Sequence, residues 1–225
     1  MSSRVLFVCA TETEASSLKN AGVGSGDMKP FGNGDINFTI LVTGVGGIAT
    51  AWSLKKWLSM NPAPDLAINI GIAGSYNPAI IPGDIVIPVK DCFADLGIET
   101  NGQFVPLSST SFLDGDGAPL RGGFIHCENE YLQKICPGSK RVTAATVNTA
   151  TGSEASINRI KRFFNPDIET MEGATFFYIF AIEKIPFLAI RSISNMVEPD
   201  RSSWDIGLAI SRLATGVEEM IKQLL

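Results

Sequence analysis

The sequence predicts an α/β protein with helices on both faces of a central sheet. Buried-strand patterns alternate with helical patterns along the chain, which is the order typical of this architecture. Residues 4–10 and 65–72 are near-continuous apolar runs, as expected of strands buried on both faces. With 225 residues the chain can bury a sizeable core, and we expect one domain spanning residues 1–225.

The first half of the chain predicts four strands. Thr11 or Thr13 is placed to cap the first helix, and Ile48, Trp52 and Leu58 form the expected apolar stripe of the second. The expected elements are, in order, a strand over 4–10, a helix over 14–20, a glycine-rich loop over 22–34, a strand over 36–43, a helix over 48–59, a strand over 65–72, a turn over 82–84, a strand over 85–88 and a less regular stretch over 91–99.

The second half begins with a polar, Gly- and Pro-punctuated stretch that we expect to run over the surface. The long apolar run of the helix expected over 171–183 must belong to the core. The expected elements are this surface stretch over 101–123, a helix over 128–136, a strand over 141–149, a helix capped within 151–153 and ending at 164, a strand over 167–170, the core helix over 171–183, a strand over 186–190 with a polar turn over 191–195, and a last helix over 205–225.

Composition excludes several classes of protein. The formal charge is −5 and no basic run stands out, so a nucleic-acid partner is not expected. No apolar run approaches the roughly 20 residues of a membrane span, so no membrane partner is expected. The N-terminus leads directly into a strand pattern, so no signal peptide is expected. The scattered cysteines favour a cytoplasmic protein over one with a disulfide framework. Reduced, buried thiols are expected of the four scattered cysteines, Cys9, Cys92, Cys127 and Cys136.

Neither a metal site nor an organic cofactor is expected. His126 is the one histidine and no C-x-x-C pair is present, so zinc ligands are too few. The turn over residues 44–47 joins a strand to a helix, as a phosphate cradle does. However, Ala49 does not complete a G-x-G-x-x-G pattern, and no acidic residue follows at the distance typical of dinucleotide binding. A tight strand-to-helix turn is the favoured interpretation.

Polar residues follow several predicted strands, where ligands bind in an open α/β sheet. Glu12 and Glu14 follow the first strand, Glu172 follows the strand over 167–170, and Asn195 ends the turn over 191–195. Small residues over 71–75 would let a ligand approach the backbone closely. The alternatives are structural, because an acid favours a helix N-terminus and an asparagine favours a turn.

Four motifs in this order resemble the purine nucleoside phosphorylase and nucleosidase superfamily. They are G-I-A-G-S over 71–75, P-G-D-I-V-I-P over 82–88, E-T-M-E-G-A over 169–174 and R-S-I-S-N over 191–195. The opening A-T-E-T-E over 10–14 is similar to the start of the hydrolytic branch, the methylthioadenosine/S-adenosylhomocysteine nucleosidases. The resemblance implies a three-layer α/β/α sandwich around a mixed, partly barrel-like sheet, and an enzyme that is a homodimer or larger homo-oligomer acting on a purine nucleoside.

The resemblance also implies roles for individual residues. Glu14 would hold the attacking water, with Glu12 as the alternative, and Glu172 would accept from the ribose hydroxyls. Met171 would lie against the sugar, and Gly74 and Ser75 would contact the substrate. Arg191 is left outside the site, as an ion-pair partner that holds the turn.

Asn195 departs from the aspartate that adenine-specific nucleosidases carry at this position. An amide offers both a donor and an acceptor, which suits a 6-oxopurine such as hypoxanthine. R-S-I-S-N with P-D-R-S-S-W over 199–204 resembles the futalosine hydrolases of this branch.

Three alternatives to a futalosine-cleaving hydrolase remain. The first is a phosphorylase, which two carboxylates at the first strand exit disfavour, because they would repel phosphate and no Arg or Lys follows before Lys19. The second is an adenine-type nucleosidase, which Asn195 disfavours. The third is a non-catalytic nucleoside- or dinucleotide-binding protein. His126 lies outside every matched motif, so a surface or structural role is expected for it.

Overall fold

The computed structural model describes residues 3–24, 28–31, 34–135 and 137–224. Most strands join one mixed sheet, ten strands of which lie in these described ranges. Along the sheet they are, in order, β2 (Met28–Phe31), β3 (Gly34–Val42), β1 (Ser3–Cys9), β4 (Leu66–Ser75), β11 (Ile168–Thr170), β10 (Arg141–Thr146), β5 (Ile85–Asp91), β9 (Phe124–His126) and β8 (Leu120–Arg121), with β12 (Phe187–Met196) pairing with both β4 and β5.

The centre of the sheet closes on itself. β12 lies parallel to β4 on one side and antiparallel to β5 on the other. The pairings β4–β11, β11–β10 and β10–β5 complete a ring of five strands, from which β1, β3 and β2 continue as an open sheet. The predicted mixed, partly barrel-like sheet is therefore confirmed.

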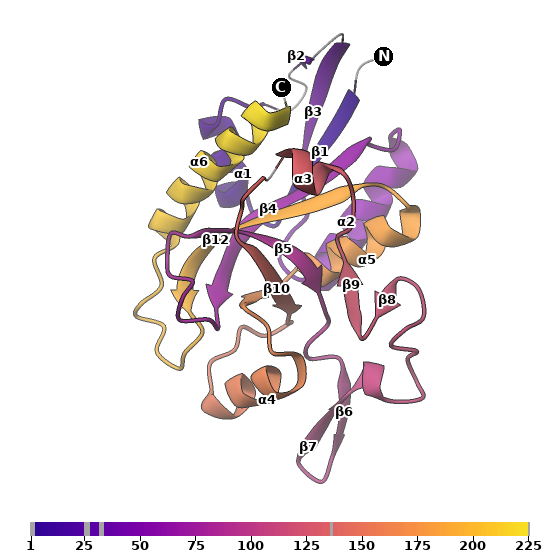
Figure 1. Ribbon diagram of the computed structural model, residues 1–225, viewed down its shortest axis with the longest axis vertical. Helices are drawn as coiled ribbons and strands as arrows, with labels where there is room; N and C mark the ends of the chain where they lie inside the picture. The colour runs from indigo at the N-terminus through magenta and orange to yellow at the C-terminus, as the bar shows by residue number, and fades with distance from the viewer. Residues whose placement is uncertain (1–2, 25–27, 32–33, 136, 225) are drawn as a thin grey trace.

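Helices cover both sides of this sheet, so the predicted three-layer arrangement is confirmed (Figure 1). On one side α1 (Glu12–Asn20) packs against α6 (Ile206–Leu224), and on the other α2 (Gly47–Met60) packs against α5 (Gly173–Glu183). The remaining described elements are a hairpin, a 3₁₀ turn and two helices. They are β6 (Gly97–Thr100) and β7 (Gln103–Pro106), η1 (Leu107–Ser109), α3 (Tyr131–Ile135) and α4 (Glu154–Phe164).

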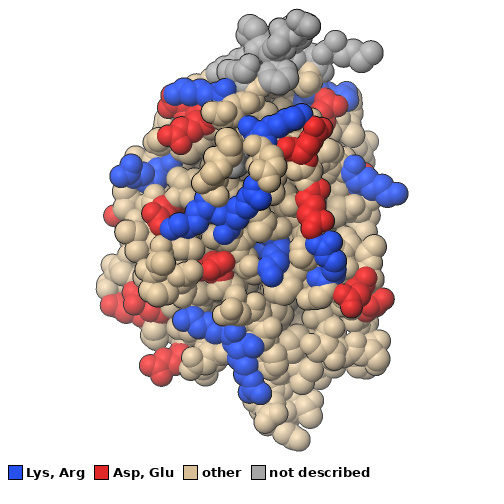
Figure 2. Space-filling model, viewed as in Figure 1, with Lys and Arg blue, Asp and Glu red and all other residues tan. Residues whose placement is uncertain are grey.

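The surface carries charges of both signs. On the face shown in Figure 2, Lys and Arg side chains are interspersed with Asp and Glu, and no extended patch of one sign forms. This face therefore offers no continuous basic stripe of the kind that binds nucleic acid. Among the helices the structure describes, none combines the length and the apolar character needed to cross a lipid bilayer.

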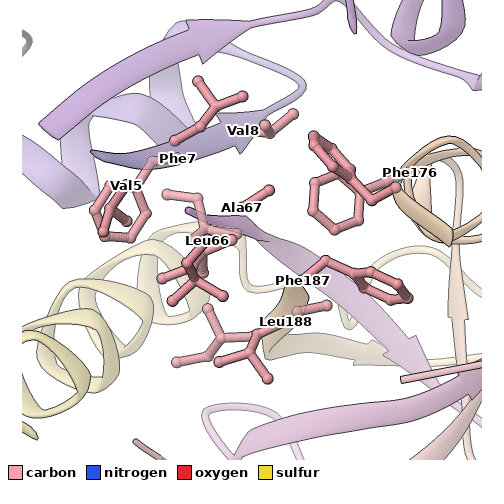
Figure 3. Packing of buried hydrophobic residues seen from close by; sticks show 14 of the residues in the cluster. Val5, Phe7, Val8, Leu66, Ala67, Phe176, Phe187 and Leu188 are labelled. Carbon is pink, nitrogen blue, oxygen red and sulfur yellow. The ribbon is translucent and has the colours of Figure 1, made fainter. Parts of the chain in front are cut away.

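The main core lies between the sheet and its helices. Phe7 of β1, Leu66 of β4 and Leu188 of β12 are at most 1% exposed, and Phe176 of α5 packs edge-on against Phe187 (Figure 3). Each fully buried side chain of this size contributes about 1.5–3 kcal/mol to folding. The core thus fixes the strands whose carboxyl ends carry the candidate site.

Two helix starts follow the sequence prediction. Thr11 caps α1, accepting from the Glu14 N–H at 3.2 Å, while the Glu14 side chain returns to the Thr11 N–H as a capping box. Of the two threonines considered, Thr11 is therefore the cap. Ser153 caps α4 by accepting from the Ser156 N–H at 3.2 Å.

The predicted polar turn over residues 191–195 is wrong. β12 continues as a strand to Met196, and β4 likewise runs on to Ser75. The two strands pair with each other along this length. Inside the closed ring the side chains of Arg191, Ser194 and Asn195 are hydrogen-bonded, whereas the buried Ser192 hydroxyl has no partner among the described residues. The prediction failed because a strand buried in a ring can carry polar side chains when its neighbours bond them.

The predicted apolar stripe of α2 is also wrong. Ile48 is 88% and Trp52 71% exposed, and the helix instead buries Thr50 and Leu54 against the rest of the protein. Leu58, the third residue of the predicted stripe, is partly buried against the core, so the three residues do not form one core-facing stripe.

The remaining differences concern short elements and boundaries. The glycine-rich loop contains the edge strand β2, the less regular stretch contains the end of β5 and β6, and the surface stretch contains β7, η1 and β8. Three predicted elements are shorter than expected, since β10 ends at Thr146, α3 begins at Tyr131 and α5 begins at Gly173. Cys136, Leu225 and residues 25–27 and 32–33 lie outside the described residues.

Candidate active site

A pocket of about 320 Å³ opens where β1, β4, β11 and β12 end. This volume falls within the range of small-molecule sites, roughly 300–1,000 Å³. The predicted residues Glu14, Gly74, Met171, Glu172 and Asn195 line it. The other lining residues are Ala10, Thr11, Thr13, Val45, Ile72, Ala73, Ala150, Thr151, Glu169, Thr170, Ser194, Trp204, Ile206 and Ile210. Residues that lie far apart in the sequence thus meet in one cavity.

Glu14 is held rigidly at the wall of this pocket. Its Oε2 accepts from the backbone N–H groups of Ala10 (3.0 Å) and Thr11 (3.1 Å), and its Oε1 accepts from the N–H of Ile72 (3.1 Å). The side chain is 8% exposed. Glu12 is exposed and does not line the pocket. Of the two glutamates considered, the geometry therefore favours Glu14.

Gly71 leaves the space that the Glu14 carboxylate occupies. A Cβ atom on Gly71 would lie 2.8 Å from Glu14 Oε1, closer than carbon and oxygen normally approach. The sequence analysis noted small residues over 71–75. In the structure, Gly71 of β4 is the one that lets the Glu14 carboxylate of α1 approach the strand closely.

Glu172 reaches across the pocket to the glycine turn. It occupies the N-cap position of α5 but makes no capping bond there, and its Oε1 accepts from the Gly46 N–H at 2.8 Å. The first N–H groups of α5 are bonded instead by two threonine hydroxyls, with Thr170 accepting from Gly173 and Thr146 from Ala174. The Glu172 carboxylate is thereby available to the pocket.

This contact also bears on the phosphate-cradle interpretation. Gly44 and Gly46 have positive φ angles of 90° and 88°, as a tight turn between strand and helix requires. The Gly46 N–H, at the start of α2, already binds the protein's own carboxylate. The structure therefore supports the tight-turn interpretation.

Burial raises the pKa of Glu172 above its usual value, and the charge of Glu14 adds to this. The Gly46 N–H and the charge of Arg191 oppose the increase. Two carboxylates facing one cavity are thus partly compensated by a nearby cation.

Arg191, which the sequence analysis left outside the site, is that cation. Its side chain is 2% exposed, and its Nη1 donates to the backbone oxygens of Asn69 (2.9 Å) and Ile190 (3.0 Å). Its Nη2 donates to the side-chain oxygen of Asn69. Burial lowers the pKa of Arg191, and the charges of Glu172, Glu14 and Asp91 oppose this. Instead of forming an ion pair within a turn, the guanidinium is held by β4 and compensates these carboxylates.

Asn195 also lines the pocket, and two neighbours fix the orientation of its amide. Its Oδ1 accepts from the Ser194 hydroxyl at 2.7 Å, and its Nδ2 donates to the Met196 carbonyl at 2.8 Å. One N–H hydrogen and one oxygen lone pair remain for a ligand. A Cβ on Gly74 would lie 3.2 Å from Asn195 Nδ2, so the glycine makes room for this amide.

Ser75 does not line the pocket, which corrects its assignment to substrate binding. It is fully buried, and its hydroxyl donates to the Asn77 carbonyl at 2.9 Å. The sequence analysis ended the strand at residue 72, but β4 continues to Ser75. The Ser75 hydroxyl is therefore bonded within the segment that follows β4 and does not reach the cavity.

Glu169 is a pocket residue to which the sequence analysis gave no role. It is 7% exposed and accepts from the Thr151 N–H at 2.8 Å and from the hydroxyls of Thr151 and Tyr76. The signal in the sequence was its place at the start of the E-T-M-E-G-A motif over 169–174, which also contains Met171 and Glu172.

His126 lies away from this pocket. It is partly buried, and its Nε2 is 3.3 Å from the Arg121 carbonyl. This fits the expected surface or structural role. Within the described residues, no group of three or more His, Cys, Asp or Glu side chains could hold a metal ion.

The profile of the Phosphorylase superfamily matches residues 5–225, and the chain belongs to this superfamily. The resemblance drawn from the motifs is therefore confirmed at this level. Among curated proteins, a futalosine hydrolase from Streptomyces coelicolor is 30% identical over 69% of this chain and 65% of its own length. A 5′-methylthioadenosine/S-adenosylhomocysteine nucleosidase from Buchnera aphidicola is 28% identical over 75% of this chain and 70% of its own length.

Solved structures share the fold over nearly the whole chain. The 5′-methylthioadenosine/S-adenosylhomocysteine nucleosidase of Neisseria meningitidis, in complex with methylthio-immucillin-A, superposes with a TM-score of 0.78 at 19% identity, covering 98% of this chain and 99% of that one. The futalosine hydrolase of Helicobacter pylori superposes with a TM-score of 0.72 at 17% identity, covering 99% and 98%.

Proposed function

We propose that this protein is a nucleosidase that hydrolyses the N-glycosidic bond of futalosine, releasing hypoxanthine and dehypoxanthine futalosine in the futalosine pathway of menaquinone biosynthesis. The observation that carries the proposal is the meeting of Glu14, Glu172 and Asn195 in one nucleoside-sized pocket. The Streptomyces coelicolor relative supports the choice of substrate, because it is a futalosine hydrolase at 30% identity.

The reaction passes through a ribosyl cation while negative charge grows on the leaving purine. Glu14, fixed by three backbone N–H groups, holds and activates the attacking water, a role worth about 10²–10⁴-fold in rate. Glu172 accepts from the ribose hydroxyls, Met171 and Gly74 contact the substrate, and Arg191 keeps the local charge balanced. The free N–H of Asn195 donates to the purine and stabilises its developing charge.

Water is favoured over phosphate as the nucleophile. Glu14 and Glu172 both face the cavity and repel an anion. Arg191 is occupied by three oxygens of Asn69 and Ile190, so its guanidinium is not free to bind phosphate. These contacts favour a hydrolase over a phosphorylase. The intact recovery of a bound nucleoside would instead favour a binding protein.

A 5′-methylthioadenosine/S-adenosylhomocysteine nucleosidase is the second candidate. It is favoured by the Buchnera aphidicola relative, whereas Asn195 favours a 6-oxopurine. The test is chromatography of futalosine, methylthioadenosine and inosine incubated with the protein, with and without phosphate. Hypoxanthine from futalosine without phosphate supports the proposal. Release that requires phosphate, or adenine from methylthioadenosine with futalosine intact, contradicts it.

We further propose that the active form is a cytoplasmic homodimer or larger homo-oligomer. Exposed apolar residues lie on the two helices that pack together on one side of the sheet: Ile48 and Trp52 on α2, and Tyr178 and Ile182 on α5, 42–88% exposed. Val45, 57% exposed, lines the pocket and leads into α2. A second copy covering this surface would therefore lie beside the active site.

The oligomer is tested with Trp52→Glu, which places a charge on that apolar surface. Sedimentation velocity is expected to show a smaller species than the parent protein. The control is Ser211→Glu, which adds the same charge at an exposed position of α6 on the other side of the sheet. A Trp52→Glu variant with the parent's sedimentation coefficient, or a monomeric parent, contradicts the proposed interface.

A further inference from the structure

Three pocket residues lie next to one another across the closed ring. Glu169 of β11 pairs with Gly74 of β4, and Asn195 of β12 pairs with the same glycine from the other side. Residues directly opposite each other share a face of the sheet. Gly74 contributes no side chain, so the Glu169 carboxylate and the Asn195 amide flank an open space above it. All three line the cavity.

The carboxylate of Glu169 is oriented with one oxygen incompletely bonded. Oε2 accepts from the hydroxyls of Thr151 and Tyr76, which uses both of its lone pairs. Oε1 accepts only from the Thr151 N–H, at 2.8 Å, among the bonds the structure describes. Glu169 and Thr151 both line the pocket. One acceptor position on a buried carboxylate is therefore available to a ligand.

We propose that Glu169 accepts a hydrogen bond from N1–H of the purine and so selects 6-oxopurines over 6-aminopurines. The inference rests on the proposed release of a purine base at this pocket. A 6-oxopurine carries a proton on N1, whereas N1 of a 6-aminopurine is a bare acceptor. A carboxylate bonds the first and repels the lone pair of the second. N7 is an acceptor in both kinds of base, so Glu169 adds at N1 a second distinction to the one that the Asn195 amide makes.

The burial of Glu169 makes this selection strong. Hydrogen bonds to a charged group are about twice as strong as neutral ones. A base without N1–H would leave the free Oε1 position without a partner in a nearly dry site, and a site built to bond a polar group rejects analogues that lack it. Tyr76 supports the arrangement, since burial and the charge of Glu169 raise the pKa of its hydroxyl and keep it a donor.

The first test needs no mutation. Calorimetry compares the binding of hypoxanthine, adenine and 1-methylhypoxanthine to the parent protein. The methyl group removes the N1 proton and leaves O6 and N7 unchanged. Hypoxanthine is expected to bind at least about 100-fold more tightly than 1-methylhypoxanthine and adenine. Equal affinity for hypoxanthine and adenine overturns the proposal.

The second test uses Glu169→Gln, which keeps the shape but replaces a charged acceptor with a neutral one. Hypoxanthine affinity should fall roughly tenfold, while adenine affinity stays constant or rises. Tyr76→Phe is the matched control, because it removes a bond to the same carboxylate from a residue outside the pocket lining. It should keep the parent's ratio of hypoxanthine to adenine affinity. An equal fall for both bases in Glu169→Gln would mean a purely structural role and contradict the proposal.

These tests separate this inference from the proposed function. Base selection is measured by binding, whichever nucleoside is cleaved. If futalosine is hydrolysed but the N1-methyl and amino bases bind as well as hypoxanthine, only the role of Glu169 fails. If hypoxanthine is selected but futalosine is not cleaved, the proposed substrate fails while the role of Glu169 stands.

Discussion

The buried acid Asp91 allows a quantitative prediction about stability and pH. It ends β5, is fully buried, and accepts from the Cys92 N–H at 2.7 Å and from the Thr146 hydroxyl at 3.0 and 3.1 Å. Through Thr146, which also accepts from Ala174, it is connected to the start of α5. Burial raises the pKa of Asp91 from 3.8 to about 7, against the opposing effects of Thr146, Arg191 and Cys92.

The direction of the pH dependence of stability follows from which state, folded or unfolded, binds the Asp91 proton. Between pH 4 and pH 7 the folded state keeps the Asp91 proton while the unfolded state releases it, so stability falls as pH rises through this range. Well above pH 7 Asp91 is ionised in both the folded and the unfolded state, and its contribution to stability is lost. The difference between 3.8 and about 7 corresponds to about 4 kcal/mol, of which about 3 kcal/mol develops between pH 5 and pH 8.

The perturbation is Asp91→Asn, which keeps the shape and can donate to Thr146 but does not titrate. Urea unfolding at fixed protein concentration gives the free energy of unfolding of parent and variant at pH 5 and pH 8. The variant should gain about 3 kcal/mol relative to the parent between these two values. The control is Glu218→Gln on α6, an exposed acid whose pKa Lys222 lowers, so no titration is expected above pH 5.

A constant difference between parent and Asp91→Asn at the two pH values would refute the reasoning. It would mean that Asp91 is ionised in the folded protein throughout this range. The Thr146 and Cys92 bonds, with the charge of Arg191, would then outweigh burial.

Three predictions concern catalysis. Glu14→Gln should lower kcat by about 10²–10⁴-fold without preventing purine binding, measured by hypoxanthine release and calorimetry; parent-like turnover would exclude Glu14 as the water-holding group. Asn195→Asp should shift the ratio of 6-oxo to 6-amino substrate activities toward 6-amino, because a carboxyl group can accept from an exocyclic amine but has no N–H to donate to a 6-oxo group; an unchanged ratio would show that residue 195 does not read the base. Gly71→Ala puts a Cβ 2.8 Å from Glu14 Oε1 and should lower kcat about 100-fold. Gly207→Ala, whose Cβ meets only Asp205 at 3.7 Å, is the control, and equal kcat values for the two alanine variants would refute the close-approach argument.

The sequence by itself determined the order of strands and helices and the local structure at several of their ends. Continuous apolar runs identified β1 and β4, and the spacing from Thr11 to Glu14 contained a capping box that forms within one helical turn. These features depend on neighbours a few residues away, so pattern and propensity are sufficient to predict them. The motif order likewise identified Glu14, Gly74, Met171, Glu172 and Asn195, which do line one pocket.

Only the tertiary structure decided which of these groups meet and how they face. The bond from Gly46 to Glu172 joins residues 126 apart, and the contact of Arg191 with Asn69 joins residues 122 apart. Closure of the ring turned the predicted turn at Asn195 into a strand, and Ser75 at the end of β4 is fully buried and bonded to the Asn77 carbonyl instead of lining the pocket. Each of these outcomes depends on contacts between segments distant in sequence, and local propensity does not specify them because strand preferences depend on the tertiary neighbours.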